Sequence, residues 1–278
     1  MKKLAFIGAG SMAEAMISGI VESKLLTGEQ IWVTNRSNQE KLDNLNQKYG
    51  VKGTYNLKEL VEDADAVILA MKPKEAAIGI SQIRSYLTEK TMLISVLAGV
   101  SIENIELLAE KKLPVVRAMP NTSATVGKSA TGLAINSYVT ERQQEIVQTI
   151  FETVGLTTFV EEKQIDAITG LSGSGPAYIY YLIEAMEKGA QEIGLDQQVA
   201  KQLIVQTLQG AAEMVATSSK PAKQLRQEVT SPGGTTEAGL RVLESFEVQK
   251  AFIQCIKEAT AQSKRLGLAL SDELYPVK

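Results

Sequence analysis

The first residues of the chain combine a short apolar run, a glycine-rich turn and an amphipathic stretch, in that order. Residues 4–7 predict a buried strand, and residues 11–26 predict a helix. Between them, Gly8-Ala9-Gly10-Ser11-Met12-Ala13 has the G-x-G-x-x-A form of a dinucleotide-binding fingerprint. The first glycine makes the turn, the second admits a pyrophosphate, and Ala13 lets the helix pack closely on the strand. The order predicts a Rossmann-type sheet, with a turn that binds nothing as the alternative.

A second strand, predicted over residues 31–34, ends at Asn35-Arg36-Ser37. Sites for NAD usually place an acidic side chain here to hold the ribose 2′-hydroxyl. This chain has an arginine between two hydrogen-bonding side chains, and a guanidinium suits a 2′-phosphate. The segment therefore predicts that NADP(H) is preferred and that NAD(H) is possible. The alternative is that Arg36 is only a solvated turn residue.

Strands and helices then alternate up to about residue 160. Further strands are predicted over residues 66–71, 91–98, 114–119, 131–135 and 157–160, with a helix over residues 140–154. Ligands of open parallel sheets bind beyond the carboxyl ends of the strands, so the residues that end these strands are expected to line the nicotinamide cleft. Lys72 is one of them and could face a phosphate or a substrate carboxylate. An ordinary surface lysine after a strand is the alternative.

From residue 163 onward the pattern is helical, with no convincing strand. We therefore expect an α/β Rossmann-type N-terminal domain (residues 1–162) followed by an all-α C-terminal dimerisation domain (residues 163–278). The predicted helix over residues 177–193 is apolar on nearly every face in its first half. A small helical domain can hardly bury such a helix alone, so a partner subunit is expected to cover it.

Two threonines stand where a proline and glycine turn, Ser231-Pro232-Gly233-Gly234, runs into a predicted helix that starts by Glu237. At a helix N-terminus the first backbone N–H groups have no partner and the dipole favours an anion. A small carboxylate could bind there with two hydroxyls alongside. The alternative is that Thr235 or Thr236 is a plain N-cap.

Four stretches together resemble the pyrroline-5-carboxylate reductase family, and the match runs nearly end to end. They are Gly8-Ala9-Gly10-Ser11-Met12, Met119-Pro120-Asn121-Thr122, residues 170–178, and Ser231-Pro232-Gly233-Gly234-Thr235-Thr236. The last stretch is the specific one, since the glycine-rich start is shared with many dehydrogenases. The family commonly carries proline after Pro-Asn-Thr, whereas Ser123 stands here, so we expect a slightly less rigid loop.

The resemblance implies hydride transfer from NAD(P)H to the imine carbon of 1-pyrroline-5-carboxylate, which gives L-proline. It implies that Thr236 is the catalytic residue, bonding the ring nitrogen. The other substrate-binding positions that it implies, with Lys72 added from its place after a strand, are Glu228, Val229, Ser231, Gly233, Gly234 and Thr235. The cofactor-binding positions that it implies, together with those already named, are Gly8, Ala9, Gly10, Ser11, Met12, Asn35, Arg36, Ser37, Asn56, Ala70, Met71, Lys72, Pro73, Ala98, Gly99, Met119, Pro120 and Asn121.

The resemblance also implies a homodimer formed through the C-terminal helices, with a ring of dimers as a further level of assembly. The active site would lie between the two domains or between subunits.

Composition narrows the chemistry, because the chain has no histidine and one cysteine. This excludes histidine-based triads, an imidazole acid or base, an internal disulfide and a multi-cysteine metal site, and no metal is expected. Cys255 stands among apolar residues and is expected to be inert packing. The net charge of -3, without a basic cluster, argues against a nucleic-acid partner. No uncharged apolar run reaches membrane-spanning length, and Glu14 interrupts the apolar start, so a cytoplasmic protein is expected.

Two other functions fit part of the pattern. One is a related NADP-dependent reductase of the β-hydroxyacid dehydrogenase type, which would share the helical second domain. Such enzymes use a helix-borne lysine as general acid, and this sequence offers no clear counterpart. The other is a non-enzymatic NADP-binding regulator, which would have no need of a carboxylate pocket.

Overall fold

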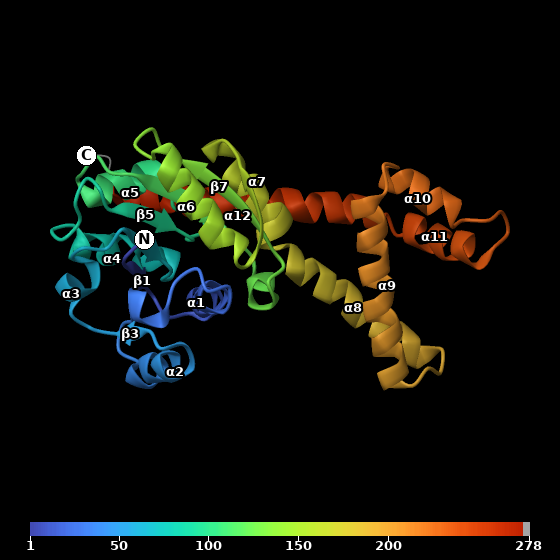
Figure 1. Cartoon of the computed structure of the whole chain (residues 1–278). Helices are drawn as coiled ribbons and strands as arrows, with labels where there is room; N and C mark the ends of the chain where they lie inside the picture. Colours follow the sequence, from blue (N-terminus) through green and yellow to red (C-terminus); the bar gives the residue numbers. More distant parts are fainter. Residues whose placement is uncertain (275–278) are drawn as a thin grey trace. The chain divides into compact units, whose positions relative to one another are not determined.

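The computed structural model describes residues 1–274, which form two compact units (Figure 1). One unit comprises Met1–Pro176 together with the chain from Lys257 onward, and the other comprises Ala177–Ile256. This division differs from the boundary expected after residue 162, because Ile165 and Ile168 pack against Met119 of the sheet. The last helix also contributes to both units. The division into compact units does not test the predicted domains, residues 1–162 and 163–278, which stay a prediction.

The first unit contains an eight-stranded sheet in the order β3-β2-β1-β4-β5-β6-β7-β8. All neighbouring strands are parallel except β6 and β7, which are antiparallel. The order of the first six strands is the one found in dinucleotide-binding folds. The strands are β1 (Leu4–Ile7), β2 (Ile31–Thr34), β3 (Lys52–Gly53), β4 (Ala66–Leu69), β5 (Met92–Ser95), β6 (Val115–Met119), β7 (Ser129–Ile135) and β8 (Gly155–Phe159).

Alternating strand residues bury the two faces of this sheet under different helices. Phe6 and Ile68 belong to the core beneath α1 (Ser11–Glu22), α2 (Gln39–Tyr49) and α6 (Glu141–Glu152). Ala5 and Val67 belong to the core beneath α3 (Leu57–Val61), α4 (Ala76–Ile83) and α5 (Ile102–Ala109). The period of two places neighbouring residues on opposite faces. The shorter segments are η1 (Gly28–Gln30), η2 (Pro73–Glu75), η3 (Thr122–Val126), η4 (Glu162–Gln164), α7 (Ile165–Ile168) and η5 (Thr169–Gly173).

The described chain after residue 163 is helical, as predicted. Its long helices are α8 (Gly175–Glu192), α9 (Gln197–Thr217), α10 (Ala222–Glu228), α11 (Thr235–Ser245) and α12 (Val248–Leu274). Asp196 caps α9 by accepting hydrogen bonds from two backbone N–H groups. Within one chain, few side chains of the second unit are buried: Ala190, Ala200 and Ile204 form a small cluster, whereas Tyr181 is 73% exposed.

Element boundaries differ from the predictions mainly at carboxyl ends. The first helix ends at Glu22 and not at residue 26, because Lys24 adopts a left-handed conformation with φ of 60°. Strand β4 ends at Leu69 and β5 at Ser95, so the turns that follow them are longer than expected. Cys255, expected to be packed, is exposed on α12, since no residue that the structure describes covers that side of the helix.

No helix in the described part of the chain combines the length and apolar character needed to cross a membrane.

A charged contact fixes α1 against α2 on one face of the sheet. Glu14 of α1 forms ion pairs with Lys41 and, at 3.4 Å, with Lys48 of α2. The hydrogen bond from Lys41 is the main reason that the pKa of Glu14 lies below its ordinary value of 4.5, and burial opposes it. The contact holds α2 close behind the turn that carries Arg36.

We expect Glu14→Gln to lower the free energy of unfolding by about 0.5–1 kcal/mol near neutral pH, the range of partly exposed ion pairs. The pKa of Glu14 is lowered in the folded state, so the ionised carboxylate stabilises the fold above the unfolded-state pKa. This stability is lost as the pH falls through the folded-state pKa. Urea unfolding of both proteins should therefore show a difference near neutral pH that disappears in acid.

Glu40→Gln is the matched control, because the Glu40 carboxylate makes no ion pair among the described residues. A Glu14→Gln deficit that persists unchanged in acid would contradict the ion pair as its cause.

Candidate functional site

The carboxyl ends of the parallel strands form one edge of the sheet, and the predicted cofactor residues lie along it. Register places Ile7 beside both Thr34 and Leu69, and Leu69 beside Ser95. The segments that follow these strands include residues 8–12, 35–37, 70–73 and 98–99. Residues 119–121 begin at the last residue of β6 and run into the loop after it. The strand order reverses between β1 and β4, the position at which such sheets bind ligands.

Gly8 sits at this reversal and has no room for a side chain. Its φ is 109°, and a Cβ atom there would lie 2.4 Å from the carbonyl oxygen of Ala70. Its N–H donates to Thr34 O at 2.9 Å, while the N–H of Ala70 donates to Ile7 O at 2.8 Å. The first glycine of the fingerprint therefore lets β1, β2 and β4 converge.

Gly10 has the opposite environment. It is the N-cap of α1, has φ of -75°, and a Cβ atom there would meet no protein atom within 4 Å. The space in the direction of a side chain at Gly10 is therefore open. It lies beside the start of α1, where no side chain caps the helix. The first backbone N–H groups of α1, beginning with Ser11 and Met12, have no intrahelical partner. This is a cradle that fits a phosphate group of a dinucleotide.

The loop after β2 is held in shape by Asn35. Its side chain donates to Asn38 O at 2.6 Å, accepts from the N–H of Asn38 at 2.7 Å, and accepts from Tyr55 Oη at 3.3 Å. Arg36 and Ser37 are exposed, and Arg36 makes no hydrogen bond or ion pair with any described residue. Asn35 therefore holds the loop in shape. The guanidinium of Arg36, next to it in the loop, is available to a ligand.

Two other predicted cofactor positions also have local structural roles. Asn56 is the N-cap of α3 and accepts from the N–H of Glu59 at 3.2 Å. Gly99 has φ of 76° and approaches α12, where its Cβ atom would lie 3.1 Å from Ser263 O and from Gly267 N. Lys72 is exposed at the start of η2, next to half-buried Met71 and Pro73.

The loop after β6 is organised by the buried side chain of Asn121. Its amide donates to Ser172 O at 2.9 Å and accepts from the N–H of Ser123 at 3.0 Å. Its backbone N–H donates to Ser129 Oγ at 3.0 Å. Ser123 thus contributes a hydrogen bond that a proline could not donate. The backbone of Ser123 joins a local hydrogen-bonded turn, and the lower rigidity of the loop stays a prediction.

The predicted substrate turn lies in the second unit, where Gly234 is the N-cap of α11 and Thr235 and Thr236 are its first residues. The N-cap alternative for the threonines is therefore wrong, and the helix begins two residues earlier than expected. Both threonines are exposed, and neither hydroxyl bonds a described residue. The N–H of Gly234 donates to Ser231 O at 3.0 Å, so the free N–H groups begin at Thr235.

Glu237 braces this turn from within the helix. Its carboxylate accepts from the N–H of Gly233 at 2.6 Å and pairs with Arg241 at 3.1 Å. Gly233 has φ of 73°, the left-handed region that glycine adopts readily. The turn is therefore shaped before any ligand arrives, and Arg241 offsets the charge of Glu237 beside a potential anion site.

The carboxylate of Glu228 is engaged at the end of α10. It accepts from Lys220 at 2.8 Å and from Gln224 at 3.1 Å. The hydrogen bond from Lys220, followed by that from Gln224, lowers the pKa of Glu228, so this group is ionised near neutral pH. Val229, the next predicted position, is exposed.

A pocket of about 360 Å³ lies between α10 and α11. Its walls include Thr230 and Glu237, which adjoin Ser231 and Thr236 in the sequence, but none of the predicted substrate residues lines it. We therefore do not assign the substrate to this pocket. In the second unit, the predicted positions Glu228, Val229, Ser231, Gly233, Gly234, Thr235 and Thr236 fall along one turn and its flanks. Lys72 belongs to the first unit.

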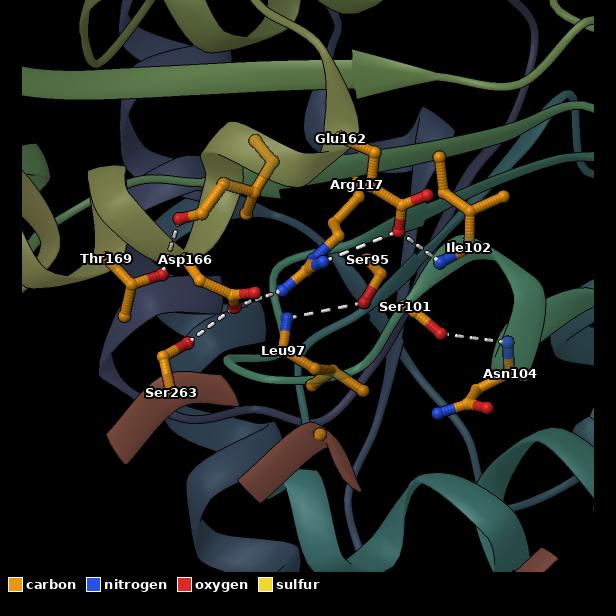
Figure 2. Close-up of polar contacts among 12 residues, drawn as sticks. Ser95, Leu97, Ser101, Ile102, Asn104, Arg117, Glu162, Asp166, Thr169 and Ser263 are labelled. Carbon is orange, nitrogen blue, oxygen red and sulfur yellow. Dashed lines mark hydrogen bonds and ion pairs between the residues drawn. The ribbon is translucent and has the colours of Figure 1, made fainter. Parts of the chain in front are cut away.

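The sequence motifs do not include Arg117, which stands in the middle of buried strand β6. Its side chain is 4% exposed and forms ion pairs with Asp166 at 2.9 Å and Glu162 at 3.4 Å (Figure 2). The signal in the sequence is a single charge inside an apolar strand. Within the described residues, no group of three histidine, cysteine or acidic side chains could hold a metal ion.

Comparisons with known proteins identify the family. A family model described as pyrroline-5-carboxylate reductase dimerisation matches residues 162–266, and one described as NADP oxidoreductase, coenzyme F420-dependent, matches residues 3–99. Pyrroline-5-carboxylate reductase 2 of Bacillus subtilis is 48% identical over 266 residues, which cover 96% of this chain and 95% of that protein. The chain belongs to the pyrroline-5-carboxylate reductase family.

Other members of the pyrroline-5-carboxylate reductase family are similar to this chain over nearly its whole length. The enzyme of Staphylococcus haemolyticus is 35% identical over 95% of this chain and 98% of that protein. Solved structures of the reductases from Coxiella burnetii and Plasmodium falciparum, the latter with NADP bound, have TM-scores of 0.86 and 0.88. They are 39% and 30% identical, and each comparison covers 95% of this chain and 98% of the other.

The two fingerprint glycines should respond differently to alanine. Gly10→Ala should cost at most about 1 kcal/mol of stability, the difference between glycine and alanine at an N-cap. It should weaken NADPH binding by about tenfold or more, because the methyl group enters the space open to a phosphate. Thermal unfolding and NADPH titration measure the two effects separately.

Gly8→Ala is the comparison variant, and it should lower stability by about 1–3 kcal/mol because of its backbone conformation and the contact with Ala70. Wild-type affinity for NADPH in Gly10→Ala would show that no phosphate binds at this turn.

Proposed function

We propose that this protein reduces 1-pyrroline-5-carboxylate to L-proline with NADPH, by hydride transfer to the ring imine carbon. The observation that carries the proposal is the N-terminus of α11, where free N–H groups and two free hydroxyls follow the family's specific turn. The near full-length identity with pyrroline-5-carboxylate reductases supports the same reaction. A non-enzymatic regulator would have no use for such a turn.

The substrate carboxylate would bind the backbone N–H groups of Thr235 and Thr236, helped by the helix dipole. Ser231 would add a hydroxyl. Gly233 and Gly234 would act by shape, since their own N–H groups bond Glu237 and Ser231. The Thr236 hydroxyl would bond the ring nitrogen. Val229 would pack near the ring. Lys72, which belongs to the first unit, stays a predicted substrate position.

An imine needs neither a covalent nucleophile nor a metal to accept hydride, because protonation of its nitrogen activates the carbon. When bound, NADPH supplies the hydride. The protein's task is to orient the ring and favour the protonated imine. Ionised Glu228 near the ring would favour that cation electrostatically, and the Thr236 hydroxyl or a water molecule would bond the nitrogen as it gains its proton.

NADPH would lie along the strand-end edge, with its pyrophosphate at Gly10 and the start of α1. Arg36 would bind the 2′-phosphate. Its guanidinium is exposed and pairs with no residue in the described part of the chain, which supports a preference for NADPH over NADH. Asn35, Ser37 and Asn56 would shape or border that end of the site. The remaining edge positions, residues 70–73, 98–99 and 119–121, would surround the ribose and nicotinamide.

For assembly, we propose a homodimer formed through the C-terminal helices. The dimerisation model matches residues 162–266, and apolar side chains such as Ile179, Tyr180 and Tyr181 are exposed on α8 within one chain. Exposed apolar patches of this kind mark interfaces. A ring of dimers and a cytoplasmic location stay predictions.

The decisive assay follows oxidation of NADPH, and separately of NADH, with pyrroline-5-carboxylate added. Oxidation of NADPH at a rate far above that with a panel of ketoacids, together with formation of proline, supports the proposal. Activity confined to that panel would favour a reductase of the β-hydroxyacid dehydrogenase type. Cofactor binding without turnover of any of these substrates would favour a regulator.

Thr236→Val keeps the shape of the side chain and removes its hydroxyl. A lost hydrogen bond of about 0.5–1.5 kcal/mol, or more if the nitrogen is left unpaired, should lower kcat/KM for the imine about 3- to 50-fold. NADPH affinity should change little. Thr230→Val is a matched control, because the Thr230 hydroxyl lies just after α10 and donates to Arg226 O of that helix. Wild-type rates for Thr236→Val would place the substrate elsewhere.

Arg36→Ala should weaken NADPH far more than NADH. Loss of a charge-assisted hydrogen bond costs about 1.5–3 kcal/mol, or about 10- to 150-fold in affinity. Direct titration with each cofactor gives the ratio, and NADH is the internal control. Equal losses for both cofactors would show that Arg36 does not bind the 2′-phosphate.

A further inference from the structure

Buried Arg117 is the centre of a partly buried polar network that joins four parts of the first unit. Its two ion-pair partners each use one oxygen twice (Figure 2). Asp166 Oδ1 accepts from Arg117 at 2.9 Å and from Ser263 Oγ of α12 at 2.7 Å. Glu162 Oε1 accepts from Arg117 at 3.4 Å and from the N–H of Ile102, the first residue of α5, at 2.7 Å.

These bonds surround residues 96–101, the segment between β5 and α5. Arg117 pairs in register with Ser95, which ends β5. Glu162 holds the start of α5, where the segment ends. Asp166 holds Ser263 of α12, and the backbone of α12 at Ser263 and Gly267 lies against Gly99 at the centre of the segment. The strand pairing of β6 with β5 therefore holds the first end of the segment, and the Arg117 guanidinium acts through Glu162 on its other end and through Asp166 on its middle.

The same network supports the loop after β6. Arg117 precedes Met119 by two residues, and Asp166 lies in α7, which leads directly into η5. Ser172 of η5 accepts the hydrogen bond from the Asn121 amide. Two of the predicted cofactor segments, residues 98–99 and 119–121, are thus connected to the Arg117 network, whose residues belong to none of the sequence motifs.

We propose that Arg117 is a positioning residue, which through Asp166 and Glu162 holds residues 98–99 and 119–121 in the arrangement that binds the nicotinamide half of NADPH. The proposal rests on the proposed function for its ligand but not for its geometry. The burial of Arg117 explains how it can position these residues. Separating a buried guanidinium from a carboxylate partner would leave its charge uncompensated, so the partners are held in place. Arg117 Nε is buried and has no hydrogen-bond partner among residues 1–274, so the charge of the guanidinium is compensated through its two ion pairs.

The test compares Asp166→Ala, which removes the bridge between Arg117 and Ser263, with Asp166→Asn, which keeps an oxygen that can accept both bonds. Hydrogen–deuterium exchange of the free protein reports on residues 96–101 and 119–126 without any cofactor. NADPH titration then gives the affinity. We expect faster exchange in both segments and about tenfold weaker NADPH binding for Asp166→Ala, in line with the effect of small misplacements. Asp166→Asn keeps the accepting oxygen but loses the charge that compensates Arg117, so both measurements should fall between those of the wild type and Asp166→Ala.

Asn136→Ala is the matched control for general destabilisation. Asn136 makes a similar bridge at the far end of β6, accepting from the N–H of Val115 at 3.1 Å and donating to Glu106 at 2.7 Å. This variant should lower the melting temperature while leaving exchange in the two segments and NADPH affinity unchanged. If Asp166→Ala does not fold, Ser263→Ala removes one hydroxyl and should shift both readouts in the same direction by less.

Wild-type exchange and affinity in a folded Asp166→Ala would overturn the proposal, and so would an equal change in Asn136→Ala. Absence of NADPH binding by the wild-type protein would refute the proposed function instead. In that case the contrast in exchange between Asp166→Ala and Asn136→Ala still decides whether the network positions the two segments.

Discussion

The close approach of β1 and β4 at Gly8 is the constraint on which the candidate site depends. The Ala70 carbonyl oxygen lies 2.4 Å from the position that a Cβ atom of Gly8 would take, so the two strand ends converge at the point where the strand order reverses. The backbone that follows then places Gly10 where its side-chain direction meets no protein atom within 4 Å. Because Gly8 has no side chain, β1 and β4 can approach each other, and the start of α1 at Gly10 can lie open to a phosphate group.

Much of this arrangement could be predicted from local sequence. The fingerprint fixed the relation between β1, its turn and α1, because strand, glycine and helix signals each fall at a required spacing. Strand β2 was predicted with its observed bounds, and the sheet was recognised from its short apolar runs. Predictions were poorer where a chain leaves a strand, as after Leu69 and Ser95, because apolar turn residues continue the same pattern beyond the last ladder bond.

Contacts between distant segments could not be predicted in this way. Arg117 and Ser263 are far apart in the sequence, and neither belongs to a motif whose spacing implies the other. Gly99 and Gly267 likewise meet only because α12 returns to the sheet. The bracing of Gly233 by Glu237 is local, and a glutamate at the third position of a helix could have suggested it. Cys255 was misjudged because apolar neighbours in the sequence do not show which side of a helix is covered.

The bonds of Asn121 have a consequence for what can replace it. One end of its amide faces the Ser172 carbonyl, which only accepts, and the other faces the Ser123 N–H, which only donates. The two partners therefore determine which end is nitrogen and which is oxygen. Aspartate has the same shape but would set a second oxygen against the carbonyl in a buried position. The loop thus discriminates between an amide and its isosteric acid, because its two neighbours have opposite polarity.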